Sequence, residues 1–440
     1  MMKLVTITFR TITSLPAAKF FLLAFTLLIS LSGGIYAQTQ DTLPITLQNA
    51  EAQFMKNNLL LIAERFNIDI ARANKIQAGL WNNPSVYLEQ NIYNPVTKKY
   101  FDAGRNGENI AQIQQLFLLA GKRNKRVQLE EINREIAEFQ FYELMRTLRF
   151  ELRNTFFDLY YQQQLITLYN QEISSLARTV QASDTLLNHG NISLKEDLRL
   201  KAFLFSLEGE RTGLINSIYE NQAKLSVLLR DTTRSFLRPV LNVSKIDSLN
   251  LASYGLPVLT AKALSSRTDL KLYEADLRYE EKNLAYQRSL AIPDLQLGTV
   301  YDRQGNYVRN YTGVSLQMNL PAFNRNQGNI QASRYRIEQN KILVEDYKRR
   351  IEAEVYETWM KGSRILNRYQ ASNRRFIADY SRLMGGVLEN YNKKNISILE
   401  FIDFYESYKA GVIEMNEIEK RRIMVFELLN YYTGEDLFNY

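Results

Sequence analysis

Few side chains in this sequence could carry chemistry. The 440-residue chain has no cysteine and a single histidine, His189. Thiolate metal sites, disulfides and cysteine nucleophiles are therefore excluded, and His-based metal or acid–base sites are disfavoured. Gly121-Lys122 is followed by Arg123 rather than serine or threonine, so it does not match a phosphate-binding loop. We expect no catalytic residue, no cofactor and no bound metal, and hence no enzyme.

Two acidic residues in the C-terminal part share a spacing that could matter. Glu400 and Asp403 are three positions apart, which places both carboxylates on one face of a helix. By itself this pattern favours a solvated acidic surface.

Residues 1–37 are typical of a secretory signal. Lys3, Arg10 and Lys19 supply a basic start, and Phe20–Leu31 is an apolar run. That run of about 12 residues is short of the ~20 needed for a spanning helix. Ala37 offers a cleavage site, so we expect an exported protein, with a retained anchor as the alternative.

Proline and glycine are missing from long stretches of the chain. No proline occurs between residues 96 and 238 or after 321, and neither residue type occurs between Lys122 and His189. Because both disfavour helices, these stretches predict very long ones. A continuous helix over Lys125–Leu187 would measure about 95 Å, which suits a bundle or coiled-coil-like assembly.

The chain repeats one plan twice. GNISLKED at 190–197 aligns with KNISILEF at 394–401, and Pro84 recurs as Pro293. Each copy consists of a helix, two short strands, a long helix, a turn and a helix, which predicts a duplicated unit of about 200 residues. The expected parts are a signal peptide at 1–37, a first repeat at 38–230 with strands at about 84–94 and 108–118, an inter-repeat segment at 231–258, and a second repeat at 259–440 with strands at about 293–303 and 310–320.

Short alternating segments are predicted as strands. Val314, Leu316, Met318 and Leu320 alternate with small or polar residues, and 85–92 shows a similar pattern. Such alternation is typical of a half-buried soluble sheet and also of membrane-barrel strands. A mean hydropathy of −0.30 excludes a helical polytopic membrane protein. If the strands span a membrane, several chains must share one barrel, because open sheet edges are not tolerated in lipid.

Along these segments the sequence resembles the TolC-like outer-membrane efflux proteins, and within them the CzcC/CusC-type members. Residues 45–91 are similar to the family's opening helix and first strand, and LFLLAGKR (116–123) to the exit of its second strand. Residues 267–305 and GVSLQMNLPAFNRNQGNI (313–330) resemble the second repeat. The resemblance implies a mainly α fold with a small membrane β part: a homotrimer whose 12-stranded β-barrel continues into a 12-helix periplasmic α-barrel.

The resemblance also assigns roles to residues at the ends of the long helices. It implies turns of the type Gly-x-x-Ser/Thr that meet an adaptor, followed by acidic residues that close the tunnel. Lys394 replaces the glycine in the second copy, which leaves open whether the two turns share one backbone conformation. The implied tip residues are Gly190, Asn191, Ile192, Ser193, Asn395, Ile396 and Ser397, the implied aperture residues are Glu400, Asp403 and Glu196, and the residues expected to face lipid are Val314, Leu316, Met318 and Leu320.

The function implied by the resemblance is a passive outer-membrane channel of a tripartite efflux system, exporting metal cations or drugs. Its partners would be a periplasmic adaptor, an inner-membrane pump and outer-membrane lipid. The protein would lie in the outer membrane and extend into the periplasm. The alternative is a periplasmic coiled-coil adaptor or scaffold protein, which would lack lipid-facing strands. The sequence leaves the cargo and the pump undetermined.

The basic run at 122–126 supports one further hypothesis. Cleavage after residue 37 would remove Lys3, Arg10 and Lys19 and lower the net charge from +8 to +5, which disfavours nucleic acid as the partner of an exported chain. Cations at a helix N-terminus oppose the helix dipole, so an offsetting partner is expected. In the implied topology this run lies where the barrel meets the periplasm. Contact with the headgroups of inner-leaflet lipids is therefore our hypothesis.

Overall fold

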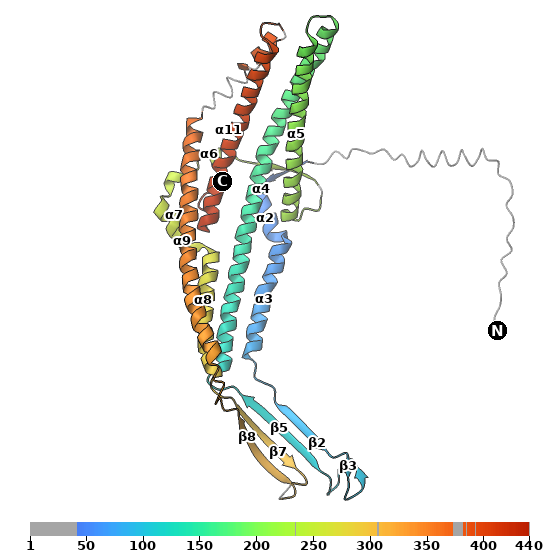
Figure 1. Ribbon diagram of the computed structural model, residues 1–440, viewed down its shortest axis with the longest axis vertical. Helices are drawn as coiled ribbons and strands as arrows, with labels where there is room; N and C mark the ends of the chain where they lie inside the picture. The colour runs from blue at the N-terminus through green and yellow to red at the C-terminus, as the bar shows by residue number, and fades with distance from the viewer. Residues whose placement is uncertain are drawn as a thin grey trace, which may run out of the picture. The chain divides into compact units, whose positions relative to one another are not determined.

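The computed structural model describes residues 42–233, 235–305, 308–372, 382–383, 385–391 and 393–439. The expected signal peptide at 1–37 lies outside these ranges. Residues 43–440 make up one compact unit, whose helices run side by side and whose main sheet follows at one end of them (Figure 1).

The first half of this unit is built mainly from two shorter helices, two strands of the main sheet and two long helices. A break between α2 and α3 is fixed by Asn58, whose side chain accepts hydrogen bonds from the backbone N–H groups of Leu60 and Leu61. The elements are α2 (Leu47–Asn57), α3 (Leu59–Gly79), β2 (Ser85–Gln90), β5 (Asn109–Phe117), α4 (Lys122–Asn188) and α5 (Leu194–Leu229).

The main elements of the second half follow the same order. Arg267 stands at the break between the two short helices, where the first half has Asn58. The elements are α7 (Leu256–Ser266), α8 (Thr268–Leu290), β7 (Leu295–Asp302), β8 (Tyr311–Met318), α9 (Gln327–Ala371) and α11 (Ile398–Thr433).

The helix α4 is continuous over 67 residues, which fits its lack of glycine and proline. It packs against α3, α5, α8 and α11, so it contacts helices of both repeats. Stability of so long a helix comes from this packing rather than from propensity.

Three apolar clusters fill the space between the helices. Phe54, Phe156 and Leu225 belong to the cluster between α2, α4 and α5. Leu200 and Phe401 belong to a second, which lies towards the two turns. The third cluster joins α7, α9 and α11 and extends to the C-terminal segment. Its members include Leu259, Ile351, Phe426 and Phe438. Fully burying one such side chain stabilises the fold by about 1.5–3 kcal/mol.

The four strands form one antiparallel sheet in the order β2-β5-β7-β8. The two repeats meet in its centre, where Ile110 of β5 pairs with Asp302 of β7. The strands β2 and β8 lie at its edges. A small hairpin of β3 (Tyr93–Asn94) and β4 (Lys99–Tyr100) occupies the connection between β2 and β5.

The segment between the repeats packs on the helices. Its strand β6 (Phe236–Val240) pairs with β1 (Thr42–Thr46). The Gln222 side chain binds the backbone of Leu237 in both directions, with Nε2 2.6 Å from the carbonyl oxygen and Oε1 3.0 Å from the N–H. A short helix α6 (Val243–Asp247) and a 3-10 turn (Leu251–Ser253) lead into α7.

Among the described residues, no helix has the length and apolar character needed to cross a membrane.

Candidate functional site

The turn between α4 and α5 is a Schellman motif. Gly190 has φ +70°, and its N–H donates to the Leu187 carbonyl at 2.9 Å. The Asn191 N–H donates to the Leu186 carbonyl at 2.8 Å. These bonds satisfy the last carbonyl groups of α4. His189 lies beside this turn, where its Nδ1 is 2.7 Å from the Thr185 carbonyl oxygen.

The turn before α11 has the same backbone although it lacks the glycine. Lys394 has φ +61°, and its N–H donates to the Tyr391 carbonyl at 2.9 Å. The Asn395 N–H donates to the Asn390 carbonyl, also at 2.9 Å. The two turns therefore share one backbone conformation, a point that the sequence had left open. The Lys394 ammonium also donates to the Asn191 carbonyl at 2.9 Å, which joins the two turns.

Each turn opens the next helix with a capping box. Ser193 Oγ accepts from the N–H of Glu196 at 3.2 Å, and Glu196 accepts from the N–H of Ser193 at 2.9 Å. Ser397 and Glu400 repeat this arrangement, at 3.3 and 2.8 Å. Each box satisfies backbone donors at the helix start.

Of the carboxylates Glu400 and Asp403, both predicted at the aperture, only Glu400 takes part in a capping box. Hydrogen bonds from the backbone and hydroxyl of Ser397 hold the pKa of Glu400 below its usual range. Glu400 is therefore ionised and oriented by its own turn. Asp403 is exposed one turn later on α11, so the two side chains do share a helix but only Glu400 belongs to the cap.

The two repeats differ immediately after their capping boxes. Asp197 is 1% exposed, accepts from Ser183 Oγ at 2.7 Å and lies 2.8 Å from Lys201 Nζ. The equivalent position in the second repeat is Phe401, which stacks on Tyr391 with ring centres 4.9 Å apart. The hydrogen bond from Lys201 is the main cause that lowers the pKa of Asp197, followed by the hydrogen bond from Ser183. One tip is thus fixed by charge and the other by aromatic packing.

A pocket of about 350 Å³ lies between the two turns. The predicted tip residues Asn191, Ile192, Asn395, Ile396 and Ser397 line it together with Glu196. Residues 204 positions apart in sequence therefore form one surface, and Ile192 and Ile396 are both half-buried there.

The sheet has one apolar and one polar face. The register aligns Leu297 with Leu316 and Thr299 with Val314, while Leu295 pairs with Met318. Because side chains alternate between faces, these residues share one face, together with Val86, Leu88, Ala111, Ile113 and Phe117 of the other strands. The opposite face carries Ser85, Gln112, Gln114, Gln296, Gly298, Gly313, Ser315 and Gln317, together with the apolar Ile110, Leu116 and Val300.

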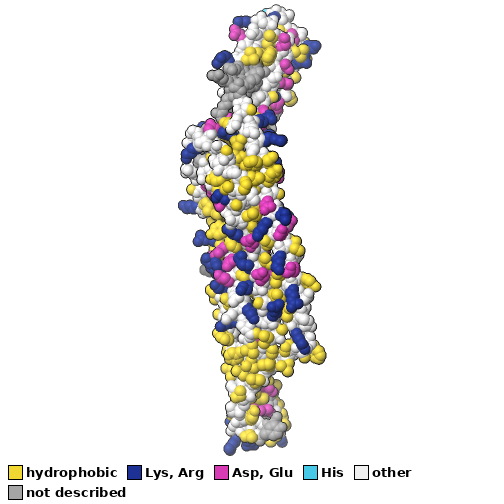
Figure 2. All heavy atoms as spheres, turned by 90° about the vertical axis from the view of Figure 1, so that its left-hand side faces the viewer, with side chains coloured by type: hydrophobic (Ala, Val, Ile, Leu, Met, Phe, Trp, Pro, Cys, Tyr) yellow, Lys and Arg dark blue, Asp and Glu magenta, His cyan; other side chains and the backbone are white. Residues whose placement is uncertain are grey.

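Three of the four residues expected to face lipid are strongly exposed in the single chain, and Met318 is 38% exposed. Val314 is 86% exposed and Leu316 67% exposed. Leu320 lies two positions beyond the end of β8, so it extends the apolar surface without belonging to the strand. Figure 2 shows hydrophobic side chains gathered where the sheet meets the helices and charged side chains over the helices.

Lys122, the first cation of the basic run at the start of α4, is bound within the protein, which removes it from the headgroup hypothesis; Arg123, Lys125 and Arg126 are partly exposed. Lys122 has a side chain only 5% exposed, and its Nζ lies 2.6 Å from both Asp294 Oδ1 and the Ile292 carbonyl oxygen. An internal carboxylate thus offsets its charge at the helix N-terminus. The other cations also have internal contacts: Lys125 with the Ala120 carbonyl, Arg126 with the Ala78 carbonyl, and Arg123 with the Trp81 ring at 4.1 Å.

Sequence reasoning missed a link between the helical hairpins. Glu210 on α5 accepts from Tyr169 on α4 at 2.8 Å and also from Lys409 on α11 at 2.8 Å. These three residues lie far apart in sequence, and only the packing of α5 beside α11 brings them together. Over the described ranges, no group of three or more acidic or histidine side chains is placed to hold a metal ion.

Comparison with known proteins agrees with this geometry. No family model matches the chain. The cobalt-zinc-cadmium resistance protein CzcC of Cupriavidus metallidurans is 24% identical over 294 residues, which cover 66% of this chain and 66% of that protein. The match thus spans slightly less than two thirds of that relative's length.

Solved structures match more of the chain. CusC superposes with a TM-score of 0.71 at 16% identity and covers 88% of this chain and 92% of its own. The Campylobacter jejuni CmeC outer membrane channel gives 0.71 at 14%, over 89% and 87%. The Vibrio cholerae outer membrane protein VceC gives 0.68 at 14%, over 88% and 96%. The chain has the fold of TolC-like outer-membrane efflux channels, and the resemblance drawn from the sequence is confirmed.

Proposed function

We propose that this protein is the channel subunit of an outer-membrane efflux system, a passive conduit that exports metal cations or drugs. The observation that carries this proposal is the two-faced sheet. Most apolar residues of the four strands lie on one face, and most amide and small residues lie on the other, which also carries Ile110, Leu116 and Val300. This division suits a sheet with lipid on one side and water on the other.

The sheet also supports assembly into a closed ring. The outer edges of β2 and β8 pair with no other strand of the described residues, and hydrocarbon does not tolerate open edges. We infer a homotrimer in which three sheets form a 12-stranded barrel and the long helices form a 12-helix tunnel reaching into the periplasm.

An exposed apolar stripe on α3 supports the same assembly. Its members recur every three or four residues, which places them on one helical face. In a ring of three chains, this face would pack against a neighbouring copy. The stripe comprises Leu59, Ile62, Phe66 and Ile70, which are 57, 41, 61 and 56% exposed.

The partners follow from the ends of the helices. We propose that the two joined tips dock with a periplasmic adaptor, which connects the channel to an inner-membrane pump. Glu400 and Asp403, with Glu196, would lie near the periplasmic aperture. The name of CzcC concerns cobalt, zinc and cadmium resistance, so divalent metal cations are the first cargo to test.

A periplasmic adaptor or scaffold remains the competing function, but it has no use for an apolar sheet face with open edges. Cell fractionation separates the two. The channel should be found in the outer membrane and run on gels as an oligomer that dissociates on heating. Deletion of the gene should sensitise cells to metal salts or drugs. A protein confined to the soluble periplasm would contradict the proposal.

A further inference from the structure

The loop that connects β2 to β5 is held by buried polar groups. Asp102 is 7% exposed, and its carboxylate accepts from Thr97 Oγ1 at 2.6 Å and from the Gly104 N–H at 2.9 Å. Asn94 is 5% exposed and accepts from the N–H groups of Val96 and Thr97. Because the buried side chains of Asn94 and Asp102 are hydrogen-bonded to the loop itself, this part of the loop has a defined conformation.

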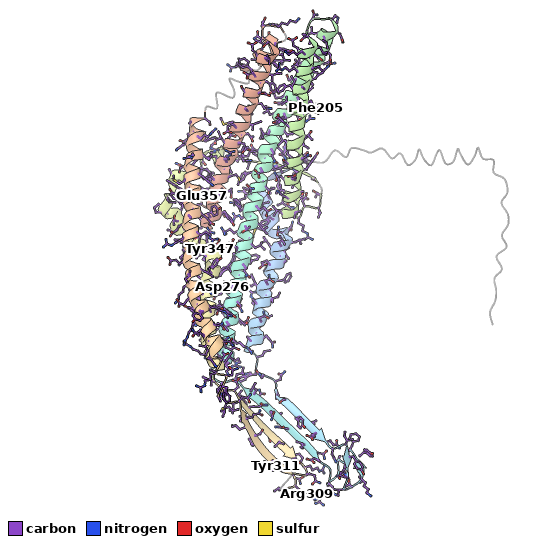
Figure 3. The ribbon with its side chains drawn as sticks, viewed as in Figure 1. Phe205, Asp276, Arg309, Tyr311, Tyr347 and Glu357 are labelled. Carbon is purple, nitrogen blue, oxygen red and sulfur yellow. The ribbon has the colours of Figure 1, made fainter. Side chains whose placement is uncertain are left out.

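The loop between β7 and β8 is attached to the first loop. Arg303 donates to the Ala103 carbonyl at 2.8 Å, and Gln304 donates to the Asn106 carbonyl at 2.9 Å. We call the described residues of these two connections, 91–108, 303–305 and 308–310, the loop platform. It lies at the end of the sheet away from the helices, as Arg309 and Tyr311 show in Figure 3.

The loop platform presents cations beside apolar side chains. Its exposed acid is Glu108, since Asp102 is buried, whereas four basic side chains are exposed. Val96, Tyr100 and Phe101 are 85, 72 and 63% exposed. The exposed cations are Lys98, Lys99, Arg105 and Arg309.

We propose that the loop platform binds the phosphate groups of anionic lipids at the outer surface of the membrane. Aromatic side chains favour the membrane interface, and clusters of basic residues attract anionic headgroups. A set of four exposed cations against one exposed acid supplies the charge, and the rings supply the interfacial contact. The inference rests on the proposed function, because that function puts this end of the sheet at the membrane surface.

Thermal melting of the purified full-length oligomer in detergent tests the proposal. The probes are diphosphorylated lipid A, phosphatidylglycerol and phosphatidylcholine. We expect lipid A, or lipid A and phosphatidylglycerol, to raise the melting temperature, and phosphatidylcholine, whose zwitterionic headgroup has no net charge, to have little effect. If only lipid A raises the melting temperature, the loop platform binds the phosphates of this glycolipid. If lipid A and phosphatidylglycerol both raise it, the platform binds anionic lipids in general. Equal responses to all three lipids would overturn the proposal.

A charge-neutral variant locates the site. Lys98→Gln/Lys99→Gln/Arg105→Gln/Arg309→Gln should weaken lipid A binding by about fivefold per removed cation, since each basic residue near an anionic surface is worth roughly 1 kcal/mol. The matched control neutralises four exposed helix lysines: Lys56→Gln/Lys224→Gln/Lys282→Gln/Lys361→Gln. Equal loss in both variants, or no loss in the loop variant, would refute the site.

Two further measurements keep this test independent of folding and of the proposed function. Lys98→Arg/Lys99→Arg keeps the charge and should retain lipid A binding; loss in this variant would contradict a role for charge. Fractionation and metal sensitivity test the channel itself. A protein that fractionates as an outer-membrane channel but ignores anionic lipid refutes only the loop proposal.

Discussion

Lys409 on α11 donates to both carboxylate oxygens of Glu210 on α5, at 2.8 and 3.0 Å. The same carboxylate accepts from the Tyr169 hydroxyl of α4. One side chain therefore ties the hairpin of the first repeat to the last helix of the second. If the tunnel widens by separating these helices, this contact must break.

Removal of the cation should loosen the contact. We expect Lys409→Gln to raise the conductance of the reconstituted channel, while the free energy of unfolding changes by less than about 1 kcal/mol because the pair is partly exposed. Planar-bilayer recordings measure the first effect and thermal melting the second. Lys361→Gln is the control, since its partner Glu357 lies on the same helix. Equal conductance in the two variants would show that the Lys409–Glu210 contact does not limit the opening of the tunnel.

The two faces of β8 should differ in their tolerance of charge. Leu316→Arg should destabilise the membrane-inserted protein by about 2–4 kcal/mol if the site is near the bilayer midplane. Gln317→Arg should cost far less, because its side chain lies on the polar face. Unfolding in lipid vesicles measures both. Equal tolerance of arginine at the two positions would count against lipid on the apolar face.

The pocket between the tips should be sensitive to bulk. Ile192→Trp or Ile396→Trp fills space that we assign to an adaptor, so each should abolish resistance without dissociating the oligomer. Tyr219→Trp on the exposed side of α5 is the control. Resistance assays with oligomer gels check the result. Full resistance with tryptophan at both pocket positions would remove this surface from adaptor docking.

A test of Glu400 as an aperture residue needs a variant that preserves its capping hydrogen bonds with Ser397. Glutamine can also close a capping box, so Glu400→Gln removes the charge and preserves the turn. We expect weaker cation selectivity in planar bilayers. Ser397→Ala is the complement, because it keeps the carboxylate but destabilises the helix start by about 1 kcal/mol. Unchanged selectivity in Glu400→Gln would place this carboxylate off the conduction path.

Glu172 on α4 should make stability depend on pH. Burial raises the pKa of Glu172 above its ordinary value, and the Tyr405 hydroxyl offsets this only in part. The folded state thus prefers the protonated form. Its contribution to stability is fully present below the unfolded pKa of about 4.3 and is lost as the pH rises through the folded pKa. Glu172→Gln should raise the melting temperature at pH 7 and leave it nearly unchanged at pH 4. A pH profile identical to wild type would contradict this assignment.

The sequence by itself determined the kind and order of the elements. The stretch without glycine or proline became α4, and the alternating residues of 311–318 became β8. The repeated Asn-Ile-Ser turns also predicted two equivalent tips. Helix and strand propensity and side-chain periodicity act over a few neighbouring residues, so they are visible in the chain itself.

Only the tertiary structure decided which side chains meet. The basic run suggested a lipid contact, yet Lys122 is paired with Asp294, 172 positions away. Glu210 gave no signal in the sequence, because its two partners lie on other helices. Even Glu400, correctly placed after a turn, has a capping role that depends on the rotamer of its own side chain. Pairing across elements follows from how helices and strands pack, which local periodicity does not encode.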